Sequence, residues 1–119
     1  MERTPERILA LGTAVLLSSI FVIDVCGLVF ACGCRSLWDG AYVACNIHHA
    51  SGPHCPWCAH PLAAGAVAFL AMAAVQARIL LGPGRAGTAL RFALALLSFP
   101  VTAGFIGAIQ GFLWDYWRP

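Results

Sequence analysis

The chain has 119 residues, of which 61% are hydrophobic and 10% are charged, with a formal net charge of +2 at pH 7. This composition excludes an ordinary soluble domain and is typical of a membrane protein. The small and scattered positive charge gives no reason to expect nucleic acid as a partner. We therefore expect a single membrane domain over residues 1–119.

Three apolar stretches are long enough to cross a bilayer, which requires about 20 residues in helical form. They cover residues 8–30, 61–81 and 90–113. The first is too long for the apolar core of a cleaved signal, and no small-x-small cleavage site follows it, so we expect a retained helix. The predicted fold class is an all-α membrane protein with three transmembrane helices and a Cys/His-rich extracytoplasmic loop over residues 31–60.

Basic and aromatic residues predict the orientation of these helices. Arg3 and Arg7 precede the first stretch and Arg85 lies between the other two, so the positive-inside rule places both regions in the cytoplasm. The loop and the C-terminus then lie outside, together with every tryptophan of the chain, as in an interfacial aromatic belt. In a bacterium this describes a multi-pass inner-membrane protein with a periplasmic loop, in an oxidising compartment.

All six cysteines and all four histidines lie between Cys26 and His60. Thiolate and imidazole groups are the ligands that copper and zinc prefer in proteins. Because a disulfide exchanger has no need of four histidines, our first hypothesis is an extracytoplasmic Cu or Zn site used in metal handling or assembly. The candidate ligands are Cys45, His48, His49, His54, Cys55, Cys58 and His60, with Cys32, Cys34 and Asp24 as further candidates.

The loop is predicted to contain a short interfacial helix. Ser36 to Asp39 has the S-x-x-D form of a capping box. Helical spacing would place Cys45 and His49 on one face, at positions i and i+4. Gly52-Pro53 would then end this helix.

A Cys-Pro-Trp-Cys segment, Cys55 to Cys58, leads into the second apolar stretch. Pro56 and Pro61 suit the first turn of a helix, so we expect this segment at a helix N-terminus, where thiolates are favoured.

This arrangement is similar to that of the membrane-embedded disulfide oxidoreductases, the DsbB and vitamin K epoxide reductase groups, which place a C-x-x-C motif beside a quinone site. Those groups generally have four core spans, and this chain has three. The resemblance implies that Cys55 and Cys58 are catalytic, with one of them facing the quinone and a partner pair drawn from Cys32, Cys34 and Cys45. A membrane thiol–disulfide oxidoreductase is the second hypothesis, so whether the chain is an enzyme stays open.

The third hypothesis is an accessory subunit whose outer loop is held together by disulfides. Six cysteines allow fifteen pairings, and the sequence does not choose among them. Ala103, Gly107 and Gly111 recur at four-residue intervals in the third stretch and would let helices approach closely. These contacts would lie within the chain, in a homo-oligomer or in a larger membrane complex.

Asp24 is an acidic residue inside the first stretch, where a carboxylate is costly and therefore suggests function. It would relay protons to the cysteines, supply an oxygen ligand, or simply meet water or the loop backbone. Gln110, at a similar depth in the third stretch, is its predicted hydrogen-bond partner.

Overall fold

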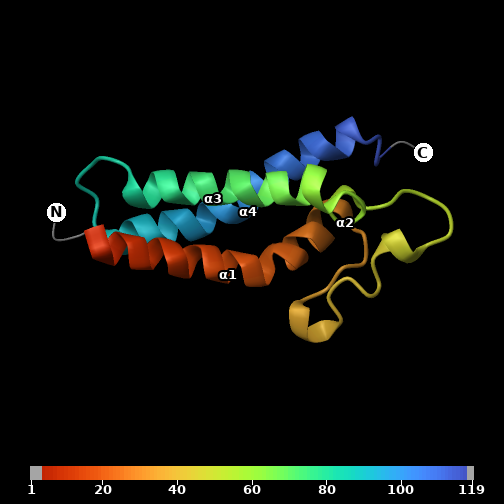
Figure 1. Cartoon of the computed structure of the whole chain (residues 1–119), viewed down its shortest axis with the longest axis horizontal. Helices are drawn as coiled ribbons and strands as arrows, with labels where there is room; N and C mark the ends of the chain where they lie inside the picture. The colour runs from red at the N-terminus through yellow and green to blue at the C-terminus, as the bar shows by residue number, and fades with distance from the viewer. Residues whose placement is uncertain (1–3, 118–119) are drawn as a thin grey trace.

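The computed structural model describes residues 4–117, and every described element is helical. Three long helices form the molecule: α1 (Thr4–Phe30), α3 (Ala66–Leu81), which continues from the π-helical turn η3 (Pro61–Gly65), and α4 (Thr88–Leu113). They lie side by side in an elongated bundle 55 Å long (Figure 1). Each is long and apolar enough to cross a membrane, over residues 4–30, 61–81 and 88–113, which confirms the three predicted spans.

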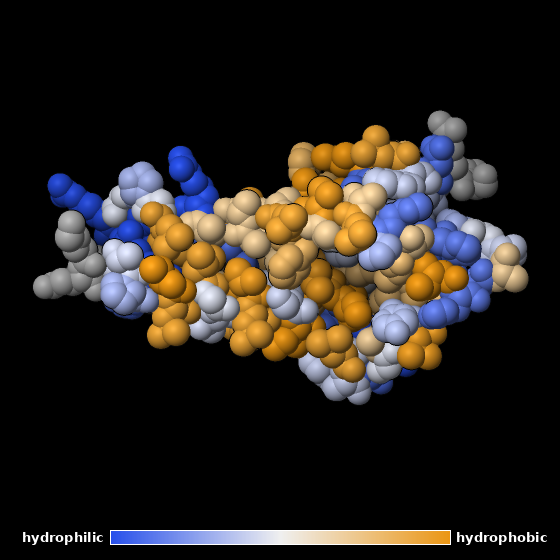
Figure 2. Space-filling model, in the orientation of Figure 1, coloured by the Kyte–Doolittle hydropathy of each residue, from blue (hydrophilic) through white to orange (hydrophobic). Residues whose placement is uncertain are grey.

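The two ends of the bundle carry different parts of the chain (Figure 1). The start of α1 and the turn between α3 and α4 lie at one end, which we call the turn end. Residues 31–60 and the end of α4 lie at the other, which we call the cysteine end. Figure 2 shows an apolar band between these two more hydrophilic ends. Arg3, which entered the predicted orientation, lies outside the described residues.

Small residues bring the three helices together. Ala14 of α1 and Ala95 of α4 are fully buried against Leu80 of α3 near the turn end. Closer to the cysteine end, a Cβ on Gly107 would lie 3.0 Å from the Val29 side chain. The predicted small-residue stripe of α4 therefore packs inside the chain, since Ala103, Gly107 and Gly111 are all buried.

A buried glutamine links the helices near the middle of the bundle. The Nε2 of Gln76 in α3 donates to Ser18 Oγ of α1 at 2.8 Å and to the Ala95 carbonyl of α4 at 3.2 Å. A polar side chain at this depth needs such partners because lipid offers none.

Arg91, in the first turn of α4, is buried at the turn end. Its guanidinium donates to the carbonyls of Ile79, Gly82, Pro83 and Ala86 over 2.7–3.2 Å. The Ile79 carbonyl belongs to the last turn of α3, where a cation is favoured by the helix dipole. The side chain thus closes the turn instead of leaving the bundle.

The predicted interfacial helix in the loop is not formed. The segment contains two short 3₁₀ turns, η1 (Leu37–Asp39) and η2 (Asn46–His48), and then the single-turn helix α2 (Pro56–Ala59). Ser36 makes no capping bond, and Gly40 has a left-handed φ of 103° that ends the first turn. Cys45 is extended, so Cys45 and His49 do not share a helical face.

Candidate metal centre

Six cysteine side chains converge at the cysteine end of the bundle, and we call them the cysteine cluster. They come from the last turn of α1, the residues that follow it, the residue before η2, and the two ends of the α2 segment. All six are free thiols, and five are buried, with Cys45 and Cys55 fully inaccessible. The members are Cys26, Cys32, Cys34, Cys45, Cys55 and Cys58.

The backbone after α1 turns sharply to deliver Cys32 and Cys34. Ala31 directly follows the helix with a φ of 47°, the left-handed conformation that commonly ends helices. Gly33 has a φ of 94°, and a Cβ there would collide with the Ala44 carbonyl. Gly27 likewise leaves room for the backbone of Cys34 against α1. Glycine at these two positions therefore allows the C-x-C segment to fold back onto the helix.

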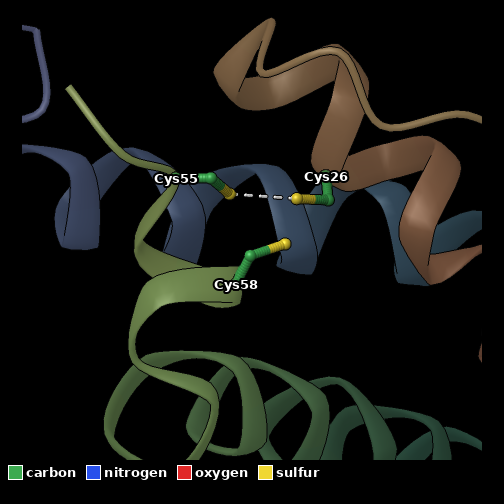
Figure 3. A group of neighbouring side chains, drawn as sticks. All are labelled: Cys26, Cys55 and Cys58. Atoms are coloured by element: carbon green, nitrogen blue, oxygen red, sulfur yellow. Dashed lines mark hydrogen bonds between the residues drawn. The ribbon is translucent and has the colours of Figure 1, made fainter. Parts of the chain in front are cut away.

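Cys55 and Cys58 are placed by proline-initiated turns, as the sequence predicts. Pro56 lies in the first turn of α2 with Cys55 as its N-cap, and Pro61 lies in the first turn of η3. Figure 3 shows both thiols pointing towards Cys26 of α1. The π-helical turn follows directly, a feature often found beside functional sites.

Asn46 and Tyr116 hold the loop in place. Asn46 Oδ1 accepts from the Cys55 amide at 2.7 Å, and its Nδ2 donates to the Tyr116 hydroxyl at 2.8 Å. That hydroxyl in turn donates to the Phe30 carbonyl at the end of α1. Burial raises the pKa of Tyr116, which keeps this phenol protonated as a donor. The loop, α1 and the C-terminal segment are thus joined through two side chains.

The sulfur atoms approach one another closely. Cys26 Sγ lies 3.2 Å from Cys55 Sγ and 3.7 Å from Cys32 Sγ, while Cys34 Sγ and Cys58 Sγ are 3.9 Å apart. These separations are those of neighbouring thiols and not of disulfides. Within the described residues the sulfurs form four triads, each able to hold a metal ion, in which all atoms lie within 4.8 Å of one another. The triads are Cys26–Cys55–Cys58, Cys26–Cys32–Cys34, Cys32–Cys45–Cys55 and Cys34–Cys45–Cys58.

The surroundings favour ionisation of some thiols over others. Hydrogen bonds from the Cys26 and Cys55 thiols lower the pKa of Cys58, and hydrogen bonds from Cys26 and Cys32 lower the pKa of Cys55. Burial raises the pKa of Cys34 and of Cys45. Because the thiolate is both the metal ligand and the nucleophile, the two cysteines of the C-x-x-C motif are the most readily ionised of these four.

The structure does not bring the histidines into the triads. All four are exposed around the loop. His48 Nε2 contacts the Tyr42 carbonyl at 3.1 Å, and His54 Nε2 contacts the His49 carbonyl at 3.0 Å. His60 lies against the Trp114 ring. The groups of side chains suited to a metal within the described residues contain cysteine alone.

Asp24 and Gln110 do not pair, contrary to the sequence-based expectation. Asp24 Oδ1 accepts a hydrogen bond from the Ser36 hydroxyl of the loop and belongs to no triad. Gln110 instead accepts from the Trp57 indole at 2.6 Å and donates to the Ala64 carbonyl at 2.9 Å. These bonds join α4 to α2 and to η3, directly beside the cluster.

Sequence reasoning missed Cys26, Asn46 and Tyr116 as site residues. Cys26 lies inside a transmembrane helix, and only its position one turn before the helix end suggests that it reaches the loop. Asn46 and Tyr116 are 70 residues apart in sequence, so no local pattern relates them.

Comparisons with known proteins identify no relative. No family model matches the chain, no curated protein is similar to it, and no solved structure resembles it. The fold and site together define a helical protein with three apolar spans and a buried cluster of six cysteines that could hold metal.

Proposed function

We propose that the protein binds a soft transition metal, copper or zinc, through the cysteine cluster and that it acts in metal handling or assembly. The convergence of six mostly buried thiols into four overlapping triads supports this proposal more than any other observation. Among the transition metals, Cu(I) and Zn(II) are ions that thiolate ligands bind preferentially. A core formed for packing alone would not need to gather every cysteine of the chain at one point.

The proposed location is the extracytoplasmic end of the bundle. Arg7, Arg78 and Arg85 lie towards the turn end, and the positive-inside rule assigns that end to the cytoplasm. In an oxidising compartment, thiols are normally paired or bound to metal. A bound metal would explain how six neighbouring thiols persist there.

Elemental analysis of anaerobically purified protein, with thiol counting on the same sample, tests the proposal. We expect copper or zinc to be retained and to fall when Cys55 is changed to serine. His49→Ala is the matched control, because His49 is close in sequence to the cluster but belongs to no triad. A metal-free protein whose six cysteines are all oxidised would contradict the proposal.

A second candidate function is oxidation of a thiol pair to a disulfide by a quinone, which an apolar groove beside the cluster favours. The groove has a volume of about 240 Å³ and opens onto two of the thiols between α1 and the start of α3. Oxidation of Cys26 and Cys55, whose sulfurs are 3.2 Å apart, would transfer two electrons and two protons to the quinone and yield a quinol. The groove is lined by Val22, Ile23, Cys26, Trp57, Cys58, Pro61, Gly65 and Phe69.

Adding a soluble quinone to the reduced, metal-free protein without oxygen tests this second function. If it holds, the free-thiol count falls by two per chain while one equivalent of quinol forms. Phe69→Trp should slow the reaction by narrowing the groove without touching a cysteine. An unchanged thiol count after prolonged incubation would eliminate this candidate.

A further inference from the structure

The four triads share their cysteines in a regular way. Any two triads share one cysteine, and every cysteine belongs to two triads. Together the triads contain twelve of the fifteen possible sulfur pairs, all within 4.8 Å. The three pairs that they leave out have no residue in common: Cys26–Cys45, Cys32–Cys58 and Cys34–Cys55.

Six points connected in this way are the corners of an octahedron, in which each omitted pair consists of opposite corners. The four triads are alternate faces of this octahedron, touching only at corners. Its other four faces are made of the same twelve pairs within 4.8 Å, and each of them shares edges with these triads. Two metals in faces that share an edge would compete for the same two sulfurs, whereas metals in alternate faces share single sulfurs.

We propose that the cysteine cluster is built for four Cu(I) ions, one in each triad, with every thiolate bridging two of them. This inference rests on the proposed function and specifies its metal and stoichiometry. Each ion would have three sulfur ligands, a coordination common for Cu(I) with thiolates. Six thiols lose their protons on loading, and four monovalent ions then leave two net negative charges on the cluster.

The sulfur separations suit this arrangement. The centre of a triangle with edges of 3.9 Å, the Cys34–Cys58 separation, lies about 2.3 Å from each corner, close to the length of a zinc–thiolate bond. A single ion at the centre of such an octahedron would lie about 2.8 Å from every sulfur, well beyond that bond length.

Tetrahedral zinc fits the same arrangement less well. Structural zinc takes four ligands. Any four of the six cysteines must include at least one of the three opposite pairs, so no quartet consists only of pairs found in the triads. A single divalent ion would also leave four net negative charges on six buried thiolates, and buried charge without a counter-ion is strongly unfavourable.

Anaerobic titration of the full-length, reduced protein in detergent with Cu(I), followed by native mass spectrometry, tests the proposal. We expect the apo form to convert to a form with four copper ions, with few intermediates because the bridging thiolates couple the sites. Saturation at one or two copper ions would overturn the tetranuclear cluster but leave soft-metal binding standing. Failure to bind any copper or zinc would contradict the proposed function as well.

Two double variants, each lacking two thiols, sharpen the test. Replacing the opposite pair, Cys26→Ser with Cys45→Ser, leaves no complete triad, because every triad contains one of these residues. Replacing the adjacent pair, Cys26→Ser with Cys55→Ser, leaves Cys34–Cys45–Cys58 complete. We expect the adjacent variant to retain at least one tightly bound Cu(I) and the opposite variant none. Equal copper content in the two folded variants would contradict the proposed connectivity. If either variant does not fold, the number of copper ions bound by the wild-type protein tests the proposal.

Discussion

The two ends of the bundle differ in how their buried polar side chains find partners. At the turn end, the Arg91 guanidinium is buried, and four carbonyls of the same chain satisfy it. At the cysteine end, six thiols are packed mainly against one another, with few partners such as the Asn46 side chain and the Cys26 carbonyl. The buried cation at the turn end is therefore held by protein groups alone, whereas the cysteine end has ligand atoms for cations that the chain itself does not supply.

This difference indicates how function and stability are divided along the molecule. Residues of the turn end should affect folding and leave metal content unchanged. Residues of the cysteine end should affect metal binding, and folding mainly through the metal. The predictions that follow test this division, from the largest expected effect to the smallest.

Metal loading should give the largest effect. A ligand that binds only the folded state at 1,000 times its dissociation constant stabilises it by about 4 kcal/mol. We therefore expect Cu(I) to raise the unfolding temperature of the reduced protein by several degrees and to slow hydrogen exchange in residues 31–60 more than in the α3–α4 turn. Equal protection from exchange at both ends, measured by mass spectrometry, would contradict the proposed division between the turn end and the cysteine end.

Arg91→Leu should destabilise the protein by roughly 2–3 kcal/mol, because it leaves buried carbonyls without their donor. Thermal unfolding in detergent measures this effect. Arg85→Leu is the matched control, since Arg85 is an exposed arginine of the same turn. The copper stoichiometry of the folded Arg91→Leu protein should equal that of the wild type, and a reduced stoichiometry would show that the two ends are coupled.

Asn46→Ala should weaken metal binding without removing a ligand. Asn46 anchors Cys55 and Tyr116, and loss of groups that orient metal ligands typically lowers affinity by about 10- to 100-fold. Competition with a chelator of known copper affinity measures the change, and Tyr116→Phe should show a smaller decrease in the same direction. Wild-type affinity in Asn46→Ala would mean that the triads form without this support.

His54→Ala should have the smallest effect. His54 is exposed, and its ring contacts only a backbone carbonyl among the described interactions. We expect the amount of bound metal to stay at the wild-type value in elemental analysis. If His54→Ala lost as much bound metal as Cys58→Ser does, His54 would have to be counted as a metal ligand.

The sequence was sufficient for the fold because transmembrane helices depend on local composition. The lengths of the apolar stretches alone predicted α1, α3 and α4, and Pro56 and Pro61 predicted the turns after Cys55. The loop was harder to predict because contacts distant in sequence determine its conformation. Asn46 bonds to Cys32 and Tyr116 instead of continuing a helix from Ser36, and this keeps Cys45 out of a helical face shared with His49.

The candidate site was predicted in part for the same reason. The grouping of cysteines in one window indicated soft-metal chemistry, but histidine was expected to share the coordination. Convergence of the thiols depends on Gly27 and Gly33, which let the backbone pack closely enough for Cys32 and Cys34 to face Cys26. Such close packing is a property of the folded chain and is not encoded in residue spacing.

X-ray absorption spectroscopy at the copper edge of the protein loaded anaerobically with Cu(I) tests the central claim most directly. If the cysteine cluster alone holds the metal, the first shell consists of about three sulfur atoms per copper, with further scattering from neighbouring copper ions. A first shell dominated by nitrogen or oxygen would contradict the account, because it would place the metal on the histidines or Asp24 and leave the six thiols without a role in binding.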